Sequence, residues 1–321
     1  MTSTYPSRGV ERDKWILAQR LPRESLDPRR PYAFLVEEEC STTREVVPVA
    51  TIFLTNRECP WRCLMCDLWR NTLAETVPAG AIPVQIDYAL SQLPSARQIK
   101  LYNSGSFFDR NAIPVEDYPA IATRVSRFER TIVESHPSLL KDNCLRFRDL
   151  VPNQLEVAIG LETVHSEILD RLNKRMTLDQ FSAAAKYLRS NEIDLRVFIL
   201  VQPPFMKADE ALYWTERSLD FAFECGATAA TLIPTRAGNG AMELLAQQEE
   251  FAPPRLDVVE SAASYGIGLS RGRVFVDLWD LRDASTACPD CHALRVERLH
   301  EMNLRQCILA PVGCESCGGR N

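Results

Sequence analysis

Six short runs rich in β-branched and apolar residues alternate with segments of helical length, and this alternation limits the fold more than any other feature. In the intervening segments 86–93, 178–190 and 210–225, apolar residues recur at helical spacing. Strands that alternate with helices are typical of a parallel sheet joined by crossover helices. The sequence therefore predicts an α/β fold built from six βα units. The expected strands cover residues 46–55, 98–102, 130–134, 154–160, 194–201 and 227–234.

The bulk composition is that of a globular chain with ample apolar material for a core. Of the 321 residues, 45% are hydrophobic and 25% are charged, which are ordinary values for such chains. No apolar run reaches the length of a membrane span and the start lacks a secretory signal, so we expect no membrane association. The net charge of −6 gives no general attraction for phosphate backbones, so nucleic-acid binding would need a local basic patch.

Seven of the eleven cysteines fall into two groups with the spacing of metal ligands. Such thiolates survive unpaired in a reducing compartment, and we therefore expect a cytoplasmic metalloprotein. The first group, Cys59-Pro-Trp-Arg-Cys63-Leu-Met-Cys66, directly follows the expected strand 46–55. Because iron–sulfur clusters normally take four cysteines, three of them would leave one iron of a [4Fe-4S] cluster open to a small molecule. The alternatives are a structural zinc site or three unrelated buried thiols.

The C-x3-C-x2-C spacing resembles the signature of the radical S-adenosylmethionine (radical SAM) superfamily. The resemblance implies that Cys59, Cys63 and Cys66 bind a [4Fe-4S] cluster and that SAM completes the coordination of the fourth iron. It implies an enzyme that cleaves SAM reductively to a 5′-deoxyadenosyl radical, which then abstracts hydrogen from a substrate. The implied fold is a partial (β/α)6 TIM-type barrel over residues 46–250, with an N-terminal extension (1–45) and a C-terminal cysteine-rich extension (251–321).

Small and acidic residues close several of the expected strands. In barrels of parallel strands the reactive groups lie at these carboxyl ends, so we expect the residues there to surround the cysteines. Ser104, Gly105 and Ser106 form a turn of small residues that the backbone can use to approach a ligand closely. By the resemblance, this turn receives the amino group of SAM. Glu134 and Glu162 end the third and fourth strands, where a carboxylate can accept hydrogen bonds from ribose hydroxyls or from an ammonium group.

Four further residues are candidates for contacts with the cofactor. Met65 directly precedes the third cysteine, and we expect it near the adenine. Lys174 offers a cation for the carboxylate of SAM, although its segment is also compatible with a surface loop. Arg196 is a charge inside an expected strand, so it faces the lumen or the edge of the sheet. Gln202 ends the fifth strand and is a candidate for contact with adenine or substrate.

The second cysteine group consists of two C-x2-C pairs near the C-terminus. Cys288 and Cys291 form the first pair, and Cys314 and Cys317 form the second. Four thiolates brought together in this way fit a structural zinc ion. They also fit an auxiliary [4Fe-4S] cluster, so the spacing alone leaves both metals open. The run 273–279 reads as an additional strand that extends the sheet toward this module.

Further motifs resemble one branch of the superfamily, which holds the Elongator catalytic subunit, the tRNA methylthiotransferases and the archaeosine-forming tRNA enzyme. These motifs are Cys63-Leu-Met-Cys66-Asp, Ser104-Gly-Ser-Phe, Glu134-Ser and Gly160-Leu-Glu-Thr. Because the chain is acidic, we expect a small metabolite as substrate, with tRNA base modification of the archaeosine type as the main alternative. A non-catalytic iron–sulfur or zinc sensor is a further alternative. Reduction of the cluster implies an electron donor such as flavodoxin or ferredoxin.

Overall fold

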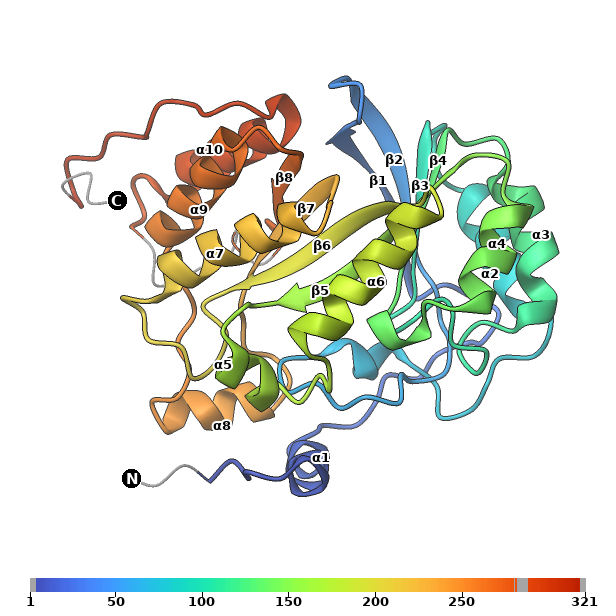
Figure 1. Ribbon diagram of the computed structural model, residues 1–321, viewed down its shortest axis with the longest axis horizontal. Coiled ribbons are helices and arrows are strands. Elements are labelled where there is room, and N and C mark those ends of the chain that lie inside the picture. The colour runs from blue at the N-terminus through green and yellow to red at the C-terminus, as the bar shows by residue number, and fades with distance from the viewer. Residues whose placement is uncertain (1–3, 280, 282–287, 318–321) are drawn as a thin grey trace.

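A single curved sheet of eight strands, in the order β1 to β8, runs through the part of the chain that the structure describes. The computed structural model describes residues 4–279, 281 and 288–317 (Figure 1). The strands are β1 (Ala33–Cys40), β2 (Val46–Phe53), β3 (Gln98–Tyr102), β4 (Arg130–Glu134), β5 (Gln154–Glu162), β6 (Asp194–Val201), β7 (Ala229–Pro234) and β8 (Arg273–Val276).

Helices connect the strands and cover the convex side of the sheet (Figure 1). None of the described helices is long and apolar enough to cross a lipid bilayer. The helices are α1 (Gly9–Ala18), η1 (Leu68–Asn71), α2 (Ala81–Leu90), η2 (Val115–Asp117), α3 (Tyr118–Val125), η3 (Pro137–Leu139), α4 (Asp142–Leu150), α5 (Ser166–Arg171), α6 (Leu178–Ser190), α7 (Ala211–Glu224), α8 (Ala241–Gln247), α9 (Leu256–Gly268) and α10 (His292–Arg305).

The six predicted parallel strands are confirmed as β2 to β7, and β8 is the predicted additional strand. β1 pairs with β2 in the antiparallel direction and lies within the segment expected as an N-terminal extension (1–45). Its sequence contains Glu37, Glu38 and Glu39 in succession, which hides the strand signal. The sheet therefore continues beyond the predicted barrel range 46–250 on both sides.

The two faces of the sheet differ in chemistry because successive side chains of a strand point to opposite sides. In β3, Ile99 and Leu101 pack in the main apolar core, together with Ile86 of α2 and Phe181 of α6. Lys100 lies between them in sequence and so points to the inner face, the lumen of the partial barrel. The outer face is thus an ordinary core beneath the helices, whereas the lumen contains polar groups.

The lumen is filled at the amino ends of the strands by a buried group of four cations and four carboxylates, which we call the floor network. Glu156 of β5 is fully buried and accepts hydrogen bonds from Arg196 at 2.6 Å, from Arg273 at 2.9 Å and from Arg130 at 3.1 Å. Burial alone would raise the pKa of Glu156, but these guanidinium groups lower it to about 2. The members of the floor network are Glu37, Glu39, Lys100, Arg130, Glu156, Asp194, Arg196 and Arg273.

The floor network also brings the first and last strands together. Arg273 of β8 donates a hydrogen bond of 3.2 Å to the backbone oxygen of Cys40 at the end of β1. Cys40 packs with Ala229 and Phe275 in a small apolar cluster beside this contact. The lumen is therefore closed at its amino end, and access to it is from the carboxyl ends of the strands, where the predicted site residues lie.

Candidate functional site

The three clustered cysteines lie on the loop that leaves the carboxyl end of β2, as the sequence predicted. Cys59, Cys63 and Cys66 are all half-buried between the end of β2 and the start of η1. Burial raises the pKa of the Cys59 and Cys63 thiols, and it raises the pKa of the Cys66 thiol to about 12. Without a metal these groups are therefore neutral thiols at pH 7, and a metal that binds them displaces their protons.

Two asparagines from distant parts of the chain hold the backbone of this cysteine loop. The Nδ2 atom of Asn173 donates to the backbone oxygen of Arg62 at 2.7 Å. The Nδ2 atom of Asn239, in the loop after β7, donates to the oxygens of Leu64 at 2.7 Å and Cys66 at 3.2 Å. Sequence reasoning missed Asn239, whose only local signal is its position between two glycines. These bonds fix the loop before any ligand binds.

Trp61 of the cysteine loop is stacked on His136, which follows β4. The ring centroids lie 3.9 Å apart and the planes are inclined by 14°. The backbone oxygen of Lys174 lies 3.1 Å from Nε2 of His136. Burial, followed by the nearby charge of Lys174, lowers the pKa of His136 to about 3, so the ring is neutral at pH 7. The stack therefore links the cysteine loop to the residues that follow β4, and through His136 to the segment that follows α5.

The predicted turn after β3 packs directly against the first cysteine. A Cβ atom added at Gly105 would lie 3.1 Å from the Cβ of Cys59, so the backbone of the turn approaches the loop closely. The hydroxyl of Ser104 shares a hydrogen bond of 2.9 Å with the phenol of Tyr32. Ser106 accepts a hydrogen bond of 2.8 Å from the backbone N–H of His136. The structure thus brings all three turn residues beside the cysteines.

The carboxylate of Glu134 holds the backbone of this turn in position. Its Oε1 atom accepts a hydrogen bond of 2.7 Å from the backbone N–H of Asn103, and the backbones of Ser104 and Gly105 also interact with it. Burial raises the pKa of Glu134, and the backbone donors oppose that effect. The sequence predicted that Glu134 contacts a cofactor. In the structure its carboxylate accepts hydrogen bonds from the backbone of the turn and so holds the turn in position.

Glu162 and Lys174 form a buried ion pair at the end of β5. Their side chains are 7% and 11% exposed, respectively. Although burial acts to lower the pKa of Lys174, the charge of Glu162 raises it, and the thiolate forms of Cys63 and Cys59 would raise it further. A Cβ atom at Gly160 would overlap both Glu162 Oε1 and Lys174 Nζ. The glycine, missed as a site residue, is what allows the pair to lie over the strand.

Three predicted residues at strand ends adopt the left-handed backbone conformation. The φ angle is 52° at Ser104, 65° at Glu162 and 53° at Gln202. Such conformations are uncommon for residues other than glycine and cluster at functional sites. Gln202 donates from Nε2 to the oxygen of Ala252 at 2.9 Å, while its buried Oε1 has no partner among the described residues. That oxygen is an acceptor available to a ligand.

Two other residues that the sequence predicted as cofactor contacts, Met65 and Arg196, have different surroundings from the residues described above. Met65 is half-buried and packs against two apolar clusters, which contain Met242 and Ile168 respectively. Arg196 does not lie at the cysteine loop. It belongs to the floor network, near the amino ends of the strands, where it is bonded to Glu39 and Glu156. The sequence left open whether this charge faces the lumen or the edge of the sheet, and the structure shows that it faces the lumen, near the amino ends of the strands.

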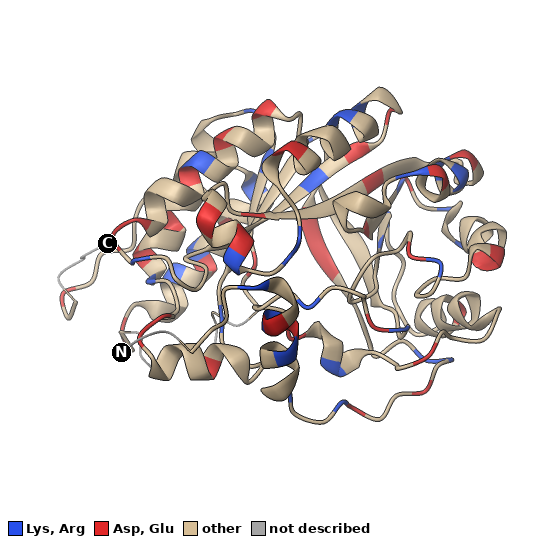
Figure 2. Cartoon of the chain, turned by 60° about the horizontal axis from the view of Figure 1, so that its bottom comes forward, with Lys and Arg blue, Asp and Glu red and all other residues tan. Residues whose placement is uncertain are grey.

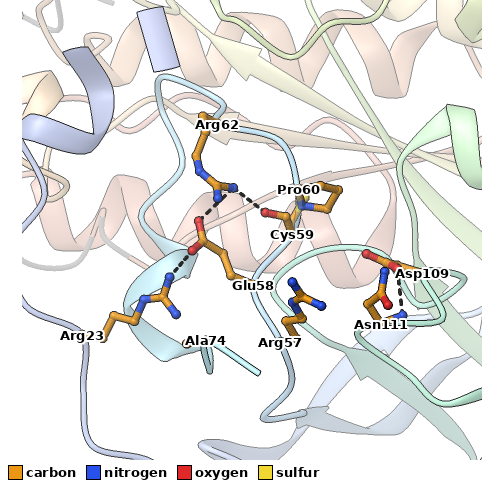
Figure 3. Close-up of a pocket in the computed structure, with 9 residues that line it drawn as sticks. All are labelled: Arg23, Arg57, Glu58, Cys59, Pro60, Arg62, Ala74, Asp109 and Asn111. Atoms are coloured by element: carbon orange, nitrogen blue, oxygen red, sulfur yellow. Dashed lines mark hydrogen bonds and ion pairs between the residues drawn. The ribbon is translucent and has the colours of Figure 1, made fainter. Parts of the chain in front are cut away.

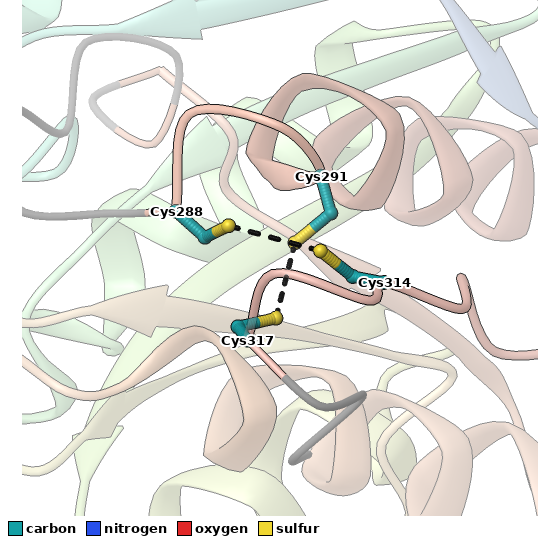
Figure 4. Close-up of side chains that lie close together, drawn as sticks. All are labelled: Cys288, Cys291, Cys314 and Cys317. Carbon is teal, nitrogen blue, oxygen red and sulfur yellow. Dashed lines mark hydrogen bonds between the residues drawn. The ribbon is translucent and has the colours of Figure 1, made fainter.

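The four C-terminal cysteines converge on one point (Figure 4). Their sulfur atoms all lie within 4.8 Å of one another, with 3.8 Å between Cys288 and Cys314 and 3.7 Å between Cys291 and Cys317. Four sulfurs at the zinc–sulfur bond length, arranged tetrahedrally around one ion, are about 3.8 Å apart. Among the described residues, the loop cysteines do not form such a close group. In a [4Fe-4S] cluster each cysteine binds a different iron, so the sulfur atoms of the loop cysteines need not converge as closely.

Comparison with known proteins agrees with the fold and with the motifs. No family model matches the chain. It is 24% identical to an uncharacterized protein of Methanocaldococcus jannaschii over 73% of this chain and 68% of the relative. It is also 24% identical to archaeosine synthase subunit beta of Methanosarcina acetivorans, over 64% of this chain and 63% of that subunit. The structure of Elp3 from Methanocaldococcus infernus matches with a TM-score of 0.51 and 14% identity, covering 70% of this chain and 60% of Elp3.

The chain therefore has a fold similar to that of Elp3, which agrees with the fold that the cysteine triplet indicated. The sequence similarity to archaeosine synthase subunit beta agrees with the branch that the motifs resemble. The chain spans about two thirds of the length of these curated relatives.

Proposed function

We propose that this protein is a radical SAM enzyme in which Cys59, Cys63 and Cys66 bind three irons of a [4Fe-4S] cluster. The observation that carries the proposal is the packing of the cysteine loop against the turn after β3, where Gly105 leaves only 3.1 Å between a would-be Cβ and Cys59. The donor set fits the cluster, since three sulfurs on a loop fixed by Asn173 and Asn239 leave one iron open.

The surrounding residues suit SAM at that open iron. The backbone of the turn at Ser104–Ser106, positioned by Glu134, offers polar groups to the amino group of SAM. In the buried ion pair, Lys174 offers a cation and Glu162 offers a carboxylate acceptor. The Oε1 atom of Gln202, which has no partner among the described residues, offers an amide acceptor. Bound together, the cluster and SAM supply a 5′-deoxyadenosyl radical that abstracts hydrogen from a substrate. The closed amino end of the lumen excludes water from that side.

The substrate that we propose is a small metabolite. Figure 2 shows Lys and Arg interspersed with Asp and Glu along the chain, and the whole chain carries a net charge of −6. A protein that binds RNA mainly through phosphates would concentrate its cations. The competing proposal is modification of a tRNA base with archaeosine-type C–N bond cleavage, and it is supported by the likeness to archaeosine synthase subunit beta.

We also propose that the C-terminal cysteines hold a single zinc ion rather than a second cluster. Sulfur separations of 3.7 and 3.8 Å match the ligands of one tetrahedral ion. Cys291 is buried at the start of α10, so the ion would join the C-terminal segment to this helix.

The test of the proposed function is SAM cleavage by protein reconstituted anaerobically with iron and sulfide. On reduction by dithionite, or by flavodoxin or ferredoxin as the proposed donors, wild-type protein should form 5′-deoxyadenosine. Cys59→Ala, Cys63→Ala and Cys66→Ala should each abolish it, while Cys307→Ala, at an exposed cysteine outside both groups, should not. Retained cleavage in a triple variant of the loop cysteines would show that the cluster is not held there.

A second measurement separates the two classes of substrate. Binding of bulk tRNA is followed while the salt concentration is raised. A slope near zero in the logarithmic plot rules out an enzyme that contacts the RNA backbone, whereas a slope of several units supports the tRNA proposal.

A further inference from the structure

A cavity of about 360 Å³ opens beside the cysteine loop (Figure 3). One part of its wall is Cys59 itself. None of the residues that carry the proposed SAM contacts lines it, so it is separate from that group. The charged residues of the wall are Arg23, Arg57, Arg62, Glu58 and Asp109.

Three guanidinium groups converge on the single carboxylate of Glu58. Arg20 donates to Oε1 at 2.7 Å, Arg62 lies 3.1 Å from the same oxygen, and Arg23 pairs with Oε2. The side chains of Arg20 and Glu58 are only 9% and 8% exposed. Arg23 and Arg62 are more exposed, at 34% and 23%, but their ion pairs with the buried Glu58 hold their positive charge in place at this wall.

Arg57 has neither a hydrogen bond nor an ion pair from its guanidinium within the described part of the chain, and the residue is exposed. Figure 3 shows its guanidinium lying between Glu58 and Asp109, joined to neither by a dashed line. Asp109 instead accepts a hydrogen bond of 2.9 Å from the backbone N–H of Asn111. Three guanidiniums and two carboxylates leave an excess of one positive charge in the wall itself. The buried Arg20, which bonds to Glu58 from behind the wall, raises this excess to two, in a chain that is acidic overall.

The cavity is also joined to the metal-binding loop by a hydrogen bond. Nη1 of Arg62 donates to the backbone oxygen of Cys59 at 2.6 Å, as well as interacting with Glu58. A ligand held by this wall would therefore lie next to a proposed cluster ligand. Concave sites of about 300 Å³ or more are typical of small-ligand pockets, whereas protein partners dock on broad surfaces.

We propose that this cavity is a phosphate-binding subsite, with Arg57 as the free contact and Arg23 and Arg62 as the fixed ones. A phosphate monoester carries a charge of about −1.5 to −2 at pH 7, which balances the excess at the wall. Arginine also matches the oxygens of phosphate with paired N–H donors. That this phosphate belongs to the substrate rests on the proposed function. Phosphate binding itself does not.

The phosphate has two possible sources with the same chemistry, a phosphorylated metabolite or the backbone of an RNA. The first test uses inorganic phosphate, titrated into the reconstituted holoprotein and followed by calorimetry. Arg57→Gln should weaken binding by about tenfold or more, because a charge-assisted hydrogen bond is lost. Arg57→Lys keeps the charge but not the paired donors, so its affinity for phosphate should lie between those of the wild type and of Arg57→Gln. The control is Arg271→Gln, at an exposed residue just before the amino end of β8, and it should change binding by less than about twofold.

A second set of titrations identifies the source. Tighter binding of a nucleoside 5′-monophosphate than of bulk tRNA supports a phosphorylated metabolite. A tRNA complex whose salt slope falls by about one unit in Arg57→Gln supports RNA phosphate. Either result upholds the subsite.

Three results would overturn the subsite. The first is no phosphate binding to the wild type, and the second is equal phosphate binding to the Arg57 and Arg271 variants. The third is that Arg57→Gln binds phosphate as the wild type does but is no longer reduced by an acidic electron carrier. The last would mark a protein-docking surface. SAM cleavage by the wild type is assayed separately, so failure of the proposed function can be told from failure of the subsite. Circular dichroism checks that each variant is folded, which is expected because the Arg57 side chain supports no other group.

Discussion

Replacing Arg196 by methionine tests whether this residue serves stability, as the structure indicates, or cofactor binding, as its sequence position suggested. The Arg196 side chain is 2% exposed, and its Nε atom lies 2.6 Å from Glu156 Oε1, with Glu39 bonded to its other nitrogens. After the change, three cations would face four carboxylates, of which Glu39 and Glu156 are buried. Removing one partner of a buried ion pair costs about 3–5 kcal/mol, a large part of the roughly 5–15 kcal/mol that stabilises a typical domain.

We expect a value near the lower end of that range, because both carboxylates keep other partners. Glu39 still bonds to Lys100 at 2.5 Å, and Glu156 still bonds to Arg273 at 2.9 Å. For a chain of 321 residues, a loss of about 3 kcal/mol corresponds to a fall in the melting temperature of about 4 °C. The double variant Arg196→Met, Glu39→Gln restores the charge balance and should regain part of this loss.

The assays are thermal unfolding by circular dichroism and SAM binding to the folded holoprotein at low temperature. A matched control is Arg97→Met, since Arg97 is 44% exposed and its ion pairs with Glu45 and Glu129 lie on the surface. Its loss should cost less than about 1 kcal/mol. In Arg196→Met, SAM affinity should stay within about twofold of wild type, because the floor network lies near the amino ends of the strands and the cysteines lie beyond their carboxyl ends. Weaker SAM binding without a fall in melting temperature would refute this reasoning.

Two further changes probe the other sites. Gly160→Ala places a Cβ where Glu162 and Lys174 now pair, so SAM affinity measured by calorimetry should fall about tenfold or more. Gly268→Ala, whose Cβ would meet nothing nearer than 3.7 Å, should leave it unchanged, and wild-type affinity in Gly160→Ala would contradict the role of the pair. Cys288→Ser should lower the zinc content measured by mass spectrometry while the iron of the loop cluster is retained, because the two metals have separate ligands. A loss of iron instead of zinc would indicate an auxiliary cluster.

Local sequence was sufficient for the strands of the parallel sheet because each is a short run of apolar residues between helical segments. β6 was predicted at its observed bounds, Asp194–Val201, and α6 at Leu178–Ser190. In the structure, α6 begins with a capping box between Thr177 and Gln180, a local signal that the sequence prediction did not use. β1 was missed because the side chains of Glu37 and Glu39 read as a polar surface, whereas they face cations donated by other strands.

The candidate site was predictable to the extent that a parallel sheet places all its strand ends on one side. That rule brought Cys59, Ser104 and Glu162 into one region without knowledge of any contact. It could not show that Glu134 would bond to the backbone of the neighbouring turn, nor that the guanidinium of Arg57 would lie in the cavity wall with no ion pair to the described residues. Both depend on distances between segments far apart in the chain.

By itself the sequence determined the order of strands and helices and the two sets of cysteines, since hydrophobic periodicity and ligand spacing are local properties of a chain. Only the tertiary structure decided which charges neutralise one another. Arg196 belongs to the floor network, whereas Lys174 pairs with Glu162 at the carboxyl end of β5, although both residues are cations. The reason is that the energy of a buried charge depends on partners within a few ångströms, and those partners come from strands up to 157 residues away along the chain.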